Sequence, residues 1–379
     1  MAAKAFPSVT LTGPRQSGKS TLCRMVFPNH PHVNLESPDV RAFAATDTRR
    51  FLRQFADGAI LDEVQRCPEL LSYLQGIIDE NPAPGRWILT GSHNLLLLDS
   101  VSQSLAGRTG VLHLLPLARG EVRRFEQYPH DVDEAILTGG YPRILDQQLA
   151  PAQWLASYVS TYLERDVRSV TRVGDLVAFQ RFVELCAGRT GQLLNLSSLA
   201  ADAGISQPTA KAWLSVLETG FIVFRLPPLH ANLRKRLVKM PKLFFLDSGL
   251  ACWLLGIRTP DQLRRHPLRG ALFETWVASE ILKHRTNQGE RGGLFFYRDR
   301  HGLEADLVVN GGAQRVVVEV KAGHTTSEDM FTAARKVKAI LDPSLPTRAV
   351  VVYAGADRQS RQDALLLPWD ELDRERWVL

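Results

Sequence analysis

The sequence lacks the long apolar runs of a membrane protein. No stretch of its 379 residues approaches the roughly 18 apolar residues that cross a bilayer, and residues 1–12 contain no signal-peptide core. We therefore expect no membrane partner and a cytoplasmic location. Cysteine is also scarce, because only four are present. Their scattered positions form neither a zinc-binding pattern nor a disulfide framework, which fits a reducing compartment.

Positive charge is only slightly in excess over negative charge. The formal net charge is +6 and the isoelectric point is near 9.2, which indicates a polyanionic partner only where the positive charge is clustered. A hydrophobic content of 45% and a charged content of 23% are typical of a globular protein. The length exceeds that of one ordinary core, and we expect three domains, over residues 1–150, 151–260 and 261–379.

Residues 13–20 read Gly-Pro-Arg-Gln-Ser-Gly-Lys-Ser and match the phosphate-binding loop G-x-x-x-x-G-K-[ST] at every fixed position. The apolar run 9–11 precedes the loop and a helix-like run follows it. This strand–loop–helix order favours a phosphate-binding loop over the alternative, a chance Gly-rich turn with a surface lysine. Backbone N–H groups and the start of the helix would face phosphate oxygens. Lys19 would reach the β- and γ-phosphates of ATP, and Ser20 would hold Mg²⁺. The expected nucleotide-binding residues are Gly13, Pro14, Arg15, Gln16, Ser17, Gly18, Lys19, Ser20 and Thr21.

Two acidic residues end the strand-like run 59–61. Asp62 would complete the Mg²⁺ shell, and Glu63 would polarise the water that attacks the γ-phosphate. An acidic pair after a strand is common, but this pair follows Lys19 in the order that a nucleotide site requires. Strands that alternate with helices here predict a parallel sheet wound with helices on both faces.

Polar side chains also end the strand-like run 86–92. Thr90, Ser92 and Asn94 are candidates for sensing the γ-phosphate, and the alternative is that their side chains only cap the strand end. Arg108 is a candidate for stabilising transition-state charge, in its own subunit or in a neighbouring one. The alternative for Arg108 is a surface ion pair.

The middle of the chain predicts a helix-turn-helix after a long helix over residues 154–170. A short helix would end at Gly204, and Ser206 would cap the next helix, with Pro208 in its first turn. The second helix would present the side chains of Gln207 and Lys211 to solvent. Strand-like runs at 221–224 and 243–246 would complete a winged helix.

Positive charge is clustered between residues 220 and 246, where no acidic residue occurs. The cluster comprises Arg225, Arg234, Lys235, Arg236, Lys239 and Lys242. Such a cluster suits contacts with the phosphate backbone of DNA. The alternative is a packing surface for a protein or another domain. The expected nucleic-acid contacts are Gln207, Lys211, Arg234, Lys235, Arg236 and Lys239.

The C-terminal part predicts a hairpin of strands 304–309 and 315–321 around an Asn-Gly-Gly turn. Asp306 stands near the start of the first strand. Glu319 and Lys321 are two residues apart on the second strand, so their side chains share a face. Antiparallel pairing would bring these three side chains together.

The three side chains predict a metal site. Asp306 and Glu319 would bind Mg²⁺ or Mn²⁺, and Glu274 from a helix would complete the shell. Lys321 would orient a water molecule or stabilise charge on phosphorus. The alternative is a structural ion pair of Glu319 and Lys321. The spacing D-x₁₂-E-x-K is typical of metal-dependent nucleases of the restriction-endonuclease type.

With these residues in hand, the whole chain resembles a prokaryotic family that joins an AAA+ ATPase module, of the archaeal-ATPase-like branch, to a C-terminal domain of unassigned function. The resemblance implies a P-loop α/β fold, a winged helix and a small α/β domain of the PD-(D/E)XK nuclease fold. Members usually carry a further helix, bordering the adenine pocket, upstream of the loop. The matching stretches are 13–21, 60–63, 89–92, 105–108, 162–167, 242–249, 254–256, 304–308 and 319–321.

Together these features predict an ATP-hydrolysing protein that couples its nucleotide state to DNA binding, with metal-dependent DNA cleavage as an added activity. One alternative is a non-catalytic switch in which ATP controls docking to a protein partner and the nuclease-like domain is degenerate. Another is a metal-dependent nuclease in which ATP sets assembly. Modules of the AAA+ type often work as homo-oligomeric rings, but the sequence alone does not give the oligomeric state.

Overall fold

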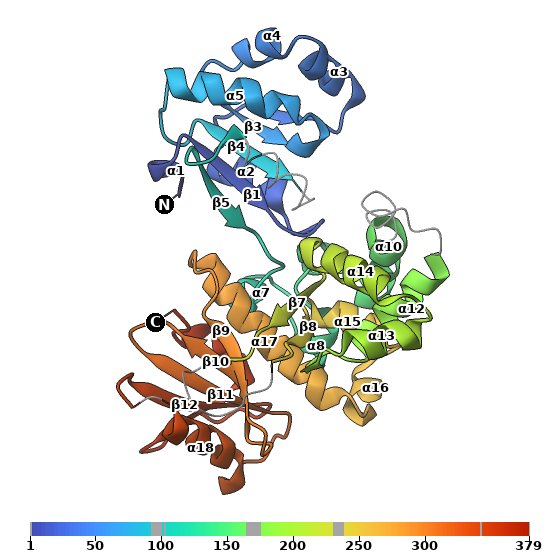
Figure 1. The fold of residues 1–379 in the computed structure, drawn as a ribbon, viewed down its shortest axis with the longest axis vertical. Helices are drawn as coiled ribbons and strands as arrows, with labels where there is room; N and C mark the ends of the chain where they lie inside the picture. The colour runs from blue at the N-terminus through green and yellow to red at the C-terminus, as the bar shows by residue number, and fades with distance from the viewer. Residues whose placement is uncertain are drawn as a thin grey trace. The chain divides into compact units, whose positions relative to one another are not determined.

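The computed structural model describes residues 2–91, 101, 104–163, 176–229, 239–341 and 343–378. The chain divides into two compact units, Met1–Leu115 and Pro116–Leu379 (Figure 1). The domain boundaries expected at 150 and 260 stay predictions. The segment after Leu115 is held by later elements of the second unit. For example, the Leu117 N–H donates to the Gly140 carbonyl over 2.7 Å.

The first unit is a parallel sheet with helices on both faces, as the sequence predicted (Figure 1). The strand order is β2-β3-β4-β1-β5, and each neighbouring pair is parallel. The strands are β1 (Ser8–Thr12), β2 (His32–Asn34), β3 (Ala59–Asp62), β4 (Trp87–Gly91) and β5 (Thr109–His113). The helical elements are α1 (Ala2–Ala5), α2 (Lys19–Val26), α3 (Pro38–Thr46), α4 (Thr48–Arg53), η1 (Val64–Arg66) and α5 (Glu69–Glu80).

Alternating side chains of the buried strands supply the two cores of this unit. Val9 and Ile60 point to the face that α2 covers, while Leu61 and Leu89 point to the face that α3, α4 and α5 cover. A parallel sheet buried on both faces needs such near-continuous apolar strands. Because all five strands are parallel, their carboxyl ends meet at one edge of the sheet.

The second unit contains a helical part and a small antiparallel sheet, with the strand order β6-β8-β7. The predicted helix-turn-helix is present: Gly204 ends α13 with φ 72°, and the Ser206 hydroxyl accepts the Thr209 N–H over 3.2 Å. The long helix expected over 154–170 is instead α10 followed by a π-helical turn, η2, and its later residues lie outside the described ones. The elements are α7 (Arg119–Val122), α8 (Val132–Thr138), α9 (Pro142–Asp146), α10 (Pro151–Tyr158), η2 (Val159–Leu163), α12 (Leu176–Ala187), β6 (Gln192–Leu193), α13 (Leu196–Ala203), α14 (Gln207–Thr219), β7 (Val223–Leu226), β8 (Lys242–Phe245), α15 (Ser248–Leu254) and α16 (Pro260–Arg265).

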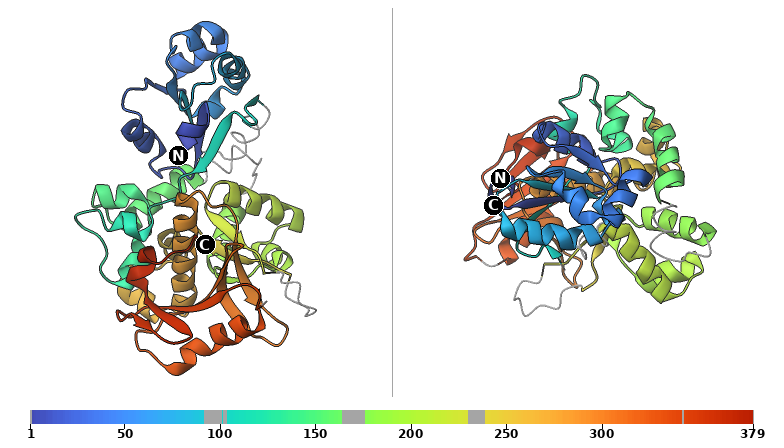
Figure 2. Two further views of the ribbon diagram at one scale, coloured as in Figure 1. Left: turned by 90° about the vertical axis from the view of Figure 1, so that its left-hand side faces the viewer. Right: turned by 90° about the horizontal axis from the view of Figure 1, so that it is seen from above.

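The same unit contains a six-stranded sheet with the order β13-β14-β12-β11-β10-β9. The long helix α17 (Arg269–Asn287) packs on one face and α18 (Thr332–Ile340) on the other (Figure 2). The predicted hairpin is confirmed, since β10 and β11 pair antiparallel with Leu307 opposite Val318. The remaining elements are β9 (Leu294–Arg298), β10 (Glu304–Asn310), β11 (Arg315–Lys321), η3 (Glu328–Phe331), β12 (Thr347–Tyr353), β13 (Gln359–Ser360), β14 (Ala364–Pro368) and η4 (Trp369–Arg374).

Within the described ranges, no helix is both long enough and apolar enough to cross a membrane.

Candidate functional site

The phosphate-binding loop lies between the carboxyl end of β1 and the start of α2, which begins at Lys19. Gly13 packs so closely on the end of β5 that an added Cβ atom would lie 2.0 Å from the Leu114 carbonyl oxygen. Only glycine fits this position. Gly18 precedes α2 in the left-handed conformation, with φ 92°, which glycine adopts at no steric cost. The fixed glycines of the motif are therefore explained by the backbone of the loop.

Lys19 is folded over this loop and is only 7% exposed. Its ammonium donates to the carbonyl oxygens of Gly13 over 3.0 Å and Pro14 over 2.8 Å. Burial lowers the pKa of Lys19 to about 8, although the nearby carboxylates of Glu63 and Asp62 oppose that shift. The ammonium thus lacks a direct carboxylate partner among the contacts that the structure gives it, and an anion in the loop would stabilise its charge.

Asp62 is the centre of a hydrogen-bonded group at the carboxyl ends of the strands. The Ser20 hydroxyl donates to its Oδ2 over 2.6 Å, and the Thr90 hydroxyl donates to its Oδ1. The structure therefore brings together three residues that the sequence predicted for metal binding and γ-phosphate sensing. A fourth residue, His32, lies with Nε2 3.3 Å from Asp62 Oδ2. Sequence analysis missed His32, whose only signal was its position in the short strand beside β3.

Glu63 follows β3 in the left-handed conformation, with φ 57° and ψ 42°. This backbone turn separates its side chain from that of Asp62, so the two carboxylates take different environments. The Gln65 side-chain amide donates to Glu63 Oε2. The predicted water-activating carboxylate is therefore held in place by a neighbour two residues along the chain.

The residues of the loop fit a nucleotide with Mg²⁺. The Ser17 hydroxyl is buried and has no hydrogen-bond partner in the part of the chain that the structure describes, so a phosphate oxygen would satisfy it. Ser20 and Asp62 offer the hard oxygen ligands that Mg²⁺ prefers. Arg15 and Gln16 belong to the same loop, whereas Thr21 is an exposed residue of α2. The candidates Ser92 and Asn94 lie outside the described residues.

Arg108 lies at the opposite edge of the sheet from the loop. It precedes β5, and its carbonyl accepts the N–H of Ser8 at the start of β1. The five residues of the strand span roughly 16 Å at about 3.3 Å each. Its guanidinium pairs with Asp79 of α5, with Nη2 2.8 Å from Oδ2, and this hydrogen bond lowers the pKa of Asp79. Within its own subunit Arg108 therefore lies away from the loop, and the structure contains the surface ion pair that was the alternative for this residue.

A second cluster of charged residues lies in the second unit, around the ammonium of Lys242. Its Nζ lies 2.5 Å from Glu304 Oε1, 2.9 Å from Glu274 Oε1 and 3.9 Å from Asp306 Oδ1. The lysine comes from β8, and the carboxylates come from α17 and β10. Lys242 was counted in the basic cluster 220–246, but it is only 3% exposed, so it fits the packing alternative for that cluster rather than a contact with DNA phosphates. The only sequence signal for its burial was its place directly before an apolar strand.

The predicted metal ligands lie at this cluster but are not arranged as a metal shell. Asp306 Oδ2 accepts the Val320 N–H over 2.8 Å, and Glu319 Oε1 pairs with Lys321 Nζ at 2.6 Å. Over the described residues, no group of three or more His, Cys, Asp or Glu side chains is placed to hold a metal ion. The Lys242 ammonium lies between Glu274 and Asp306 instead, which is the physical reason for this outcome.

The pKa values of the cluster follow from burial and mutual repulsion. Burial, followed by the charge of Asp306, raises the pKa of Glu274 to about 8. The same two causes raise the pKa of Glu319 to about 7. For Lys242, burial lowers the pKa, but the three surrounding carboxylates outweigh it and hold that pKa above its ordinary value. Lys242 is thus firmly protonated at neutral pH.

The predicted nucleic-acid residues are only partly described. Gln207 and Lys211 are exposed on α14, as predicted, and Lys239 is exposed before β8. Arg225 pairs with Glu218. The remaining predicted contacts, Arg234, Lys235 and Arg236, lie outside the described residues.

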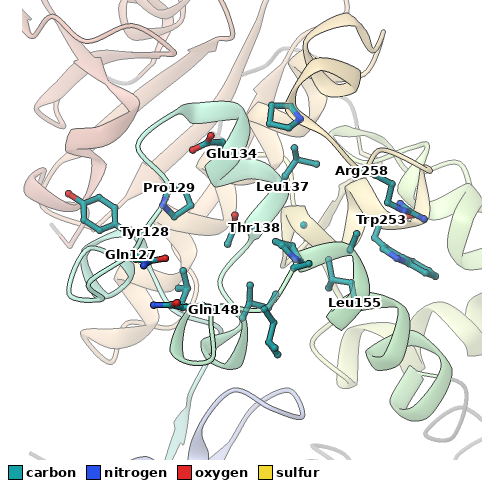
Figure 3. A pocket seen from close by; sticks show the side chains of 18 of the residues that line it. Gln127, Tyr128, Pro129, Glu134, Leu137, Thr138, Gln148, Leu155, Trp253 and Arg258 are labelled. Carbon is teal, nitrogen blue, oxygen red and sulfur yellow. The ribbon is translucent and has the colours of Figure 1, made fainter.

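The second unit also contains a groove of about 450 Å³ that no sequence pattern indicated. Figure 3 shows it between the segment carrying Tyr128, Leu137 and Leu155 and the segment carrying Trp253 and Arg258. The Arg258 guanidinium lies 4.8 Å from the centre of the Trp253 ring. The lining is mainly apolar and contains none of the predicted site residues.

Comparison with known proteins divides the chain into three consecutive stretches. Family models match an AAA domain over residues 5–123, Domain of unknown function (DUF8612) over 129–261 and Domain of unknown function (DUF4143) over 269–372. The predicted AAA+ module is confirmed by the first of these. The matches to the later stretches leave the winged helix and the nuclease-like fold as predictions.

Two mycobacterial proteins are similar to almost the whole chain. They are "Uncharacterized protein Rv2008c" of Mycobacterium tuberculosis and "Uncharacterized protein Mb2031c" of Mycobacterium bovis. Each is 30% identical over 370 residues, which are 97% of this chain and 81% of the relative. Among solved structures, the Walker-type ATPase paby2304 of Pyrococcus abyssi aligns with a TM-score of 0.44 and 17% identity, over 67% of this chain and 92% of its own.

Proposed function

Because the chain belongs to the same family as these mycobacterial proteins, and because its residues 5–123 match an AAA domain, we propose that it is an Mg²⁺-dependent ATPase that acts as a nucleotide-controlled switch. One observation carries the proposal. The Asp62 carboxylate joins the Ser20 hydroxyl at the start of α2 to the Thr90 hydroxyl at the end of β4. Residues for binding a metal and for sensing a phosphate thus form one connected group.

Each residue of the group has a distinct task in ATP hydrolysis. Lys19 supplies positive charge to the β- and γ-phosphates, and the loop N–H groups and the Ser17 hydroxyl donate to phosphate oxygens. Ser20 and Asp62 hold Mg²⁺, which when bound neutralises charge on the phosphates. Glu63 accepts a hydrogen bond from the attacking water and receives its proton. Thr90 reports a change at the γ-phosphate to Asp62 through their hydrogen bond.

Two substitutions test the ATPase. Lys19→Ala should abolish tight ATP binding, because the phosphates lose their principal counter-charge. Glu63→Gln should bind ATP but hydrolyse it at least about 100-fold more slowly, because the amide cannot take a proton while the Mg²⁺ ligands remain. Phosphate release and binding of a fluorescent ATP analogue measure the two effects.

Glu36→Gln is the matched control, because Glu36 is an exposed carboxylate of the same unit that pairs only loosely with Arg66, at 3.6 Å. It should leave both readings unchanged. Hydrolysis by Glu63→Gln at the wild-type rate would show that another residue activates the water.

DNA binding is a second candidate function, favoured by the exposed Gln207 and Lys211 at the start of α14. The helix-turn-helix and the strand pair β7–β8 support a winged helix that presents this face to phosphates. Replacing Arg234, Lys235 and Arg236 by alanine should weaken binding to all DNA sequences. It should also reduce the salt slope, which is the steepness with which the logarithm of the binding constant falls with the logarithm of the salt concentration, by roughly 3.

Docking to a protein partner is the alternative use of the switch, and the groove of Figure 3 supports it. An unchanged salt slope in the triple variant would favour this alternative. In either case we propose a nuclease-like fold for the C-terminal domain, with its acidic residues used for structure. ATP turnover measured with and without single-stranded, duplex and branched DNA separates the two candidates.

A further inference from the structure

The charged cluster of the second unit contains its own cation. Lys242 begins β8 of the three-stranded sheet, and its ammonium enters a group of carboxylates carried by α17 and the six-stranded sheet. Its side chain is 4% exposed, and Glu274 and Asp306 are 16% and 17% exposed. The ammonium is therefore buried in the protein, with these carboxylates as its direct neighbours.

The carboxylates come from parts of the chain that are far apart in sequence. Glu274 is on α17, Glu304 and Asp306 are on β10, and Glu319 is on β11. Arg298 closes one side of the cluster, with Nη1 3.3 Å from Glu304 Oε2. Lys321 closes the other side by pairing with Glu319. Positive charge thus reaches the cluster from three directions.

Lys242 occupies the position between Glu274, Glu304 and Asp306 at which a divalent cation shared by these three carboxylates would lie. Its Nζ lies within 3 Å of an oxygen of both Glu274 and Glu304, which is hydrogen-bond distance for an ammonium. The Phe296 ring lies 5.6 Å from the same Nζ, on the apolar side. A divalent cation at these oxygens would stand directly against the ammonium, and two positive charges at such a distance in a buried site repel strongly.

We propose that the Lys242 ammonium is the resident cation of this carboxylate cluster, that it excludes Mg²⁺ and Mn²⁺, and that it fixes the three-stranded sheet to the six-stranded sheet in place of a metal. The predicted nuclease-like site is therefore filled by the chain itself. Glu319 Oε2 is buried and has no partner among the described residues, so this oxygen still has room for a donor.

Replacing the lysine should convert the cluster into a metal site. Lys242→Met keeps the length of the side chain and removes the charge, so Glu274, Glu304 and Asp306 would lack a cation. We expect the full-length variant, without nucleotide, to bind Mn²⁺ at least about 100-fold more tightly than the wild type. Mn²⁺ should also raise the melting temperature of the variant and leave that of the wild type unchanged. Titration calorimetry and thermal unfolding give these readings.

The controls locate the bound ion. Adding Glu304→Gln and Asp306→Asn to Lys242→Met should remove the new Mn²⁺ binding. If Lys242→Met is unfolded alone, refolding it with Mn²⁺ should restore the fold, and failure to do so would contradict the proposal. Wild-type protein that binds Mn²⁺ and loses that binding in Asp306→Asn would overturn it. Since no nucleotide is present, these outcomes are independent of the proposed ATPase.

Discussion

Lys19 and Lys242 are both buried lysines, but their surroundings shift their pKa values in opposite directions. Lys19 donates to two backbone carbonyls, and burial lowers its pKa to about 8. Lys242 lies among three carboxylates, which hold its pKa above the ordinary value in spite of burial. One ammonium is stabilised only weakly by the protein, and the other is stabilised fully.

The difference separates a binding site from a structural ion cluster. A charge that the fold leaves poorly compensated gains most when a ligand of opposite charge arrives, so Lys19 is suited to phosphate. A charge that the fold has already paired gains nothing from a ligand, and a ligand must displace it. Acidic residues in a favourable spacing, such as Asp306 and Glu319, therefore do not make a metal site when lysines of the same fold already neutralise the cluster.

The two lysines should respond oppositely to removal of their charge, and this is the largest effect that we expect on stability. Lys242→Met leaves buried carboxylates without a partner and should lower the free energy of unfolding by about 3–5 kcal/mol. Lys19→Met removes a buried charge that has no direct carboxylate partner, and should leave stability within about 1 kcal/mol of wild type. Chemical denaturation of the full-length chain without nucleotide measures both, and equal losses would remove the distinction.

The raised pKa of Glu274 makes the stability of the cluster depend on pH. Because the folded-state pKa is about 8 and the ordinary value is 4.5, the folded state binds the proton more tightly than the unfolded state. This contribution is fully present below about pH 4.5 and is lost as the pH rises through about 8. Glu274→Gln should therefore flatten the fall in melting temperature between these values. A smaller fall that ends near pH 7 should remain, because Glu319 titrates there in the folded protein.

The nucleotide site could be predicted from the sequence because its residues are adjacent or follow a fixed order. Gly13, Gly18, Lys19 and Ser20 lie in one loop, and Asp62 ends the next long apolar strand. Parallel strands bring their carboxyl ends to one edge of a sheet, so order along the chain was enough to place these residues together. His32 was missed because its contact with Asp62 depends on the pairing of β2 with β3, which no local pattern encodes.

The C-terminal cluster could be predicted only in part. The β10–β11 hairpin is local, so the closeness of Asp306 and Glu319 followed from its turn and register. Lys242 reaches them from another sheet, and its neighbours in sequence are basic or apolar. Counting charges along the chain placed Lys242 only in a basic cluster, and tertiary packing determines that this lysine is buried.

His32 should have a smaller, specific effect on the nucleotide site. Its imidazole contacts the same Asp62 oxygen as the Ser20 hydroxyl, so it helps to orient the carboxylate. His32→Phe should raise the Mg²⁺ concentration needed for half-maximal ATP turnover by roughly 2–10-fold, the value of one hydrogen bond. His32→Gln, which retains an N–H donor, should restore most of the loss. Binding of an ATP analogue in chelator should be equal in all three proteins, and a change there would indicate a general disturbance of the loop.

The Arg108–Asp79 ion pair should have the smallest effect of all. The pair is exposed and lies at the sheet edge away from the loop, and such pairs contribute little to stability. Arg108→Ala and Asp79→Ala should therefore have the same turnover as wild type.

The two variants also test whether Arg108 acts in a neighbouring subunit, because Asp79→Ala keeps the guanidinium and Arg108→Ala removes it. A loss of turnover in Arg108→Ala alone, with partial recovery when that protein is mixed with Lys19→Ala, would show that Arg108 acts across a subunit boundary. Equal turnover in both variants would leave Arg108 as one half of a surface ion pair.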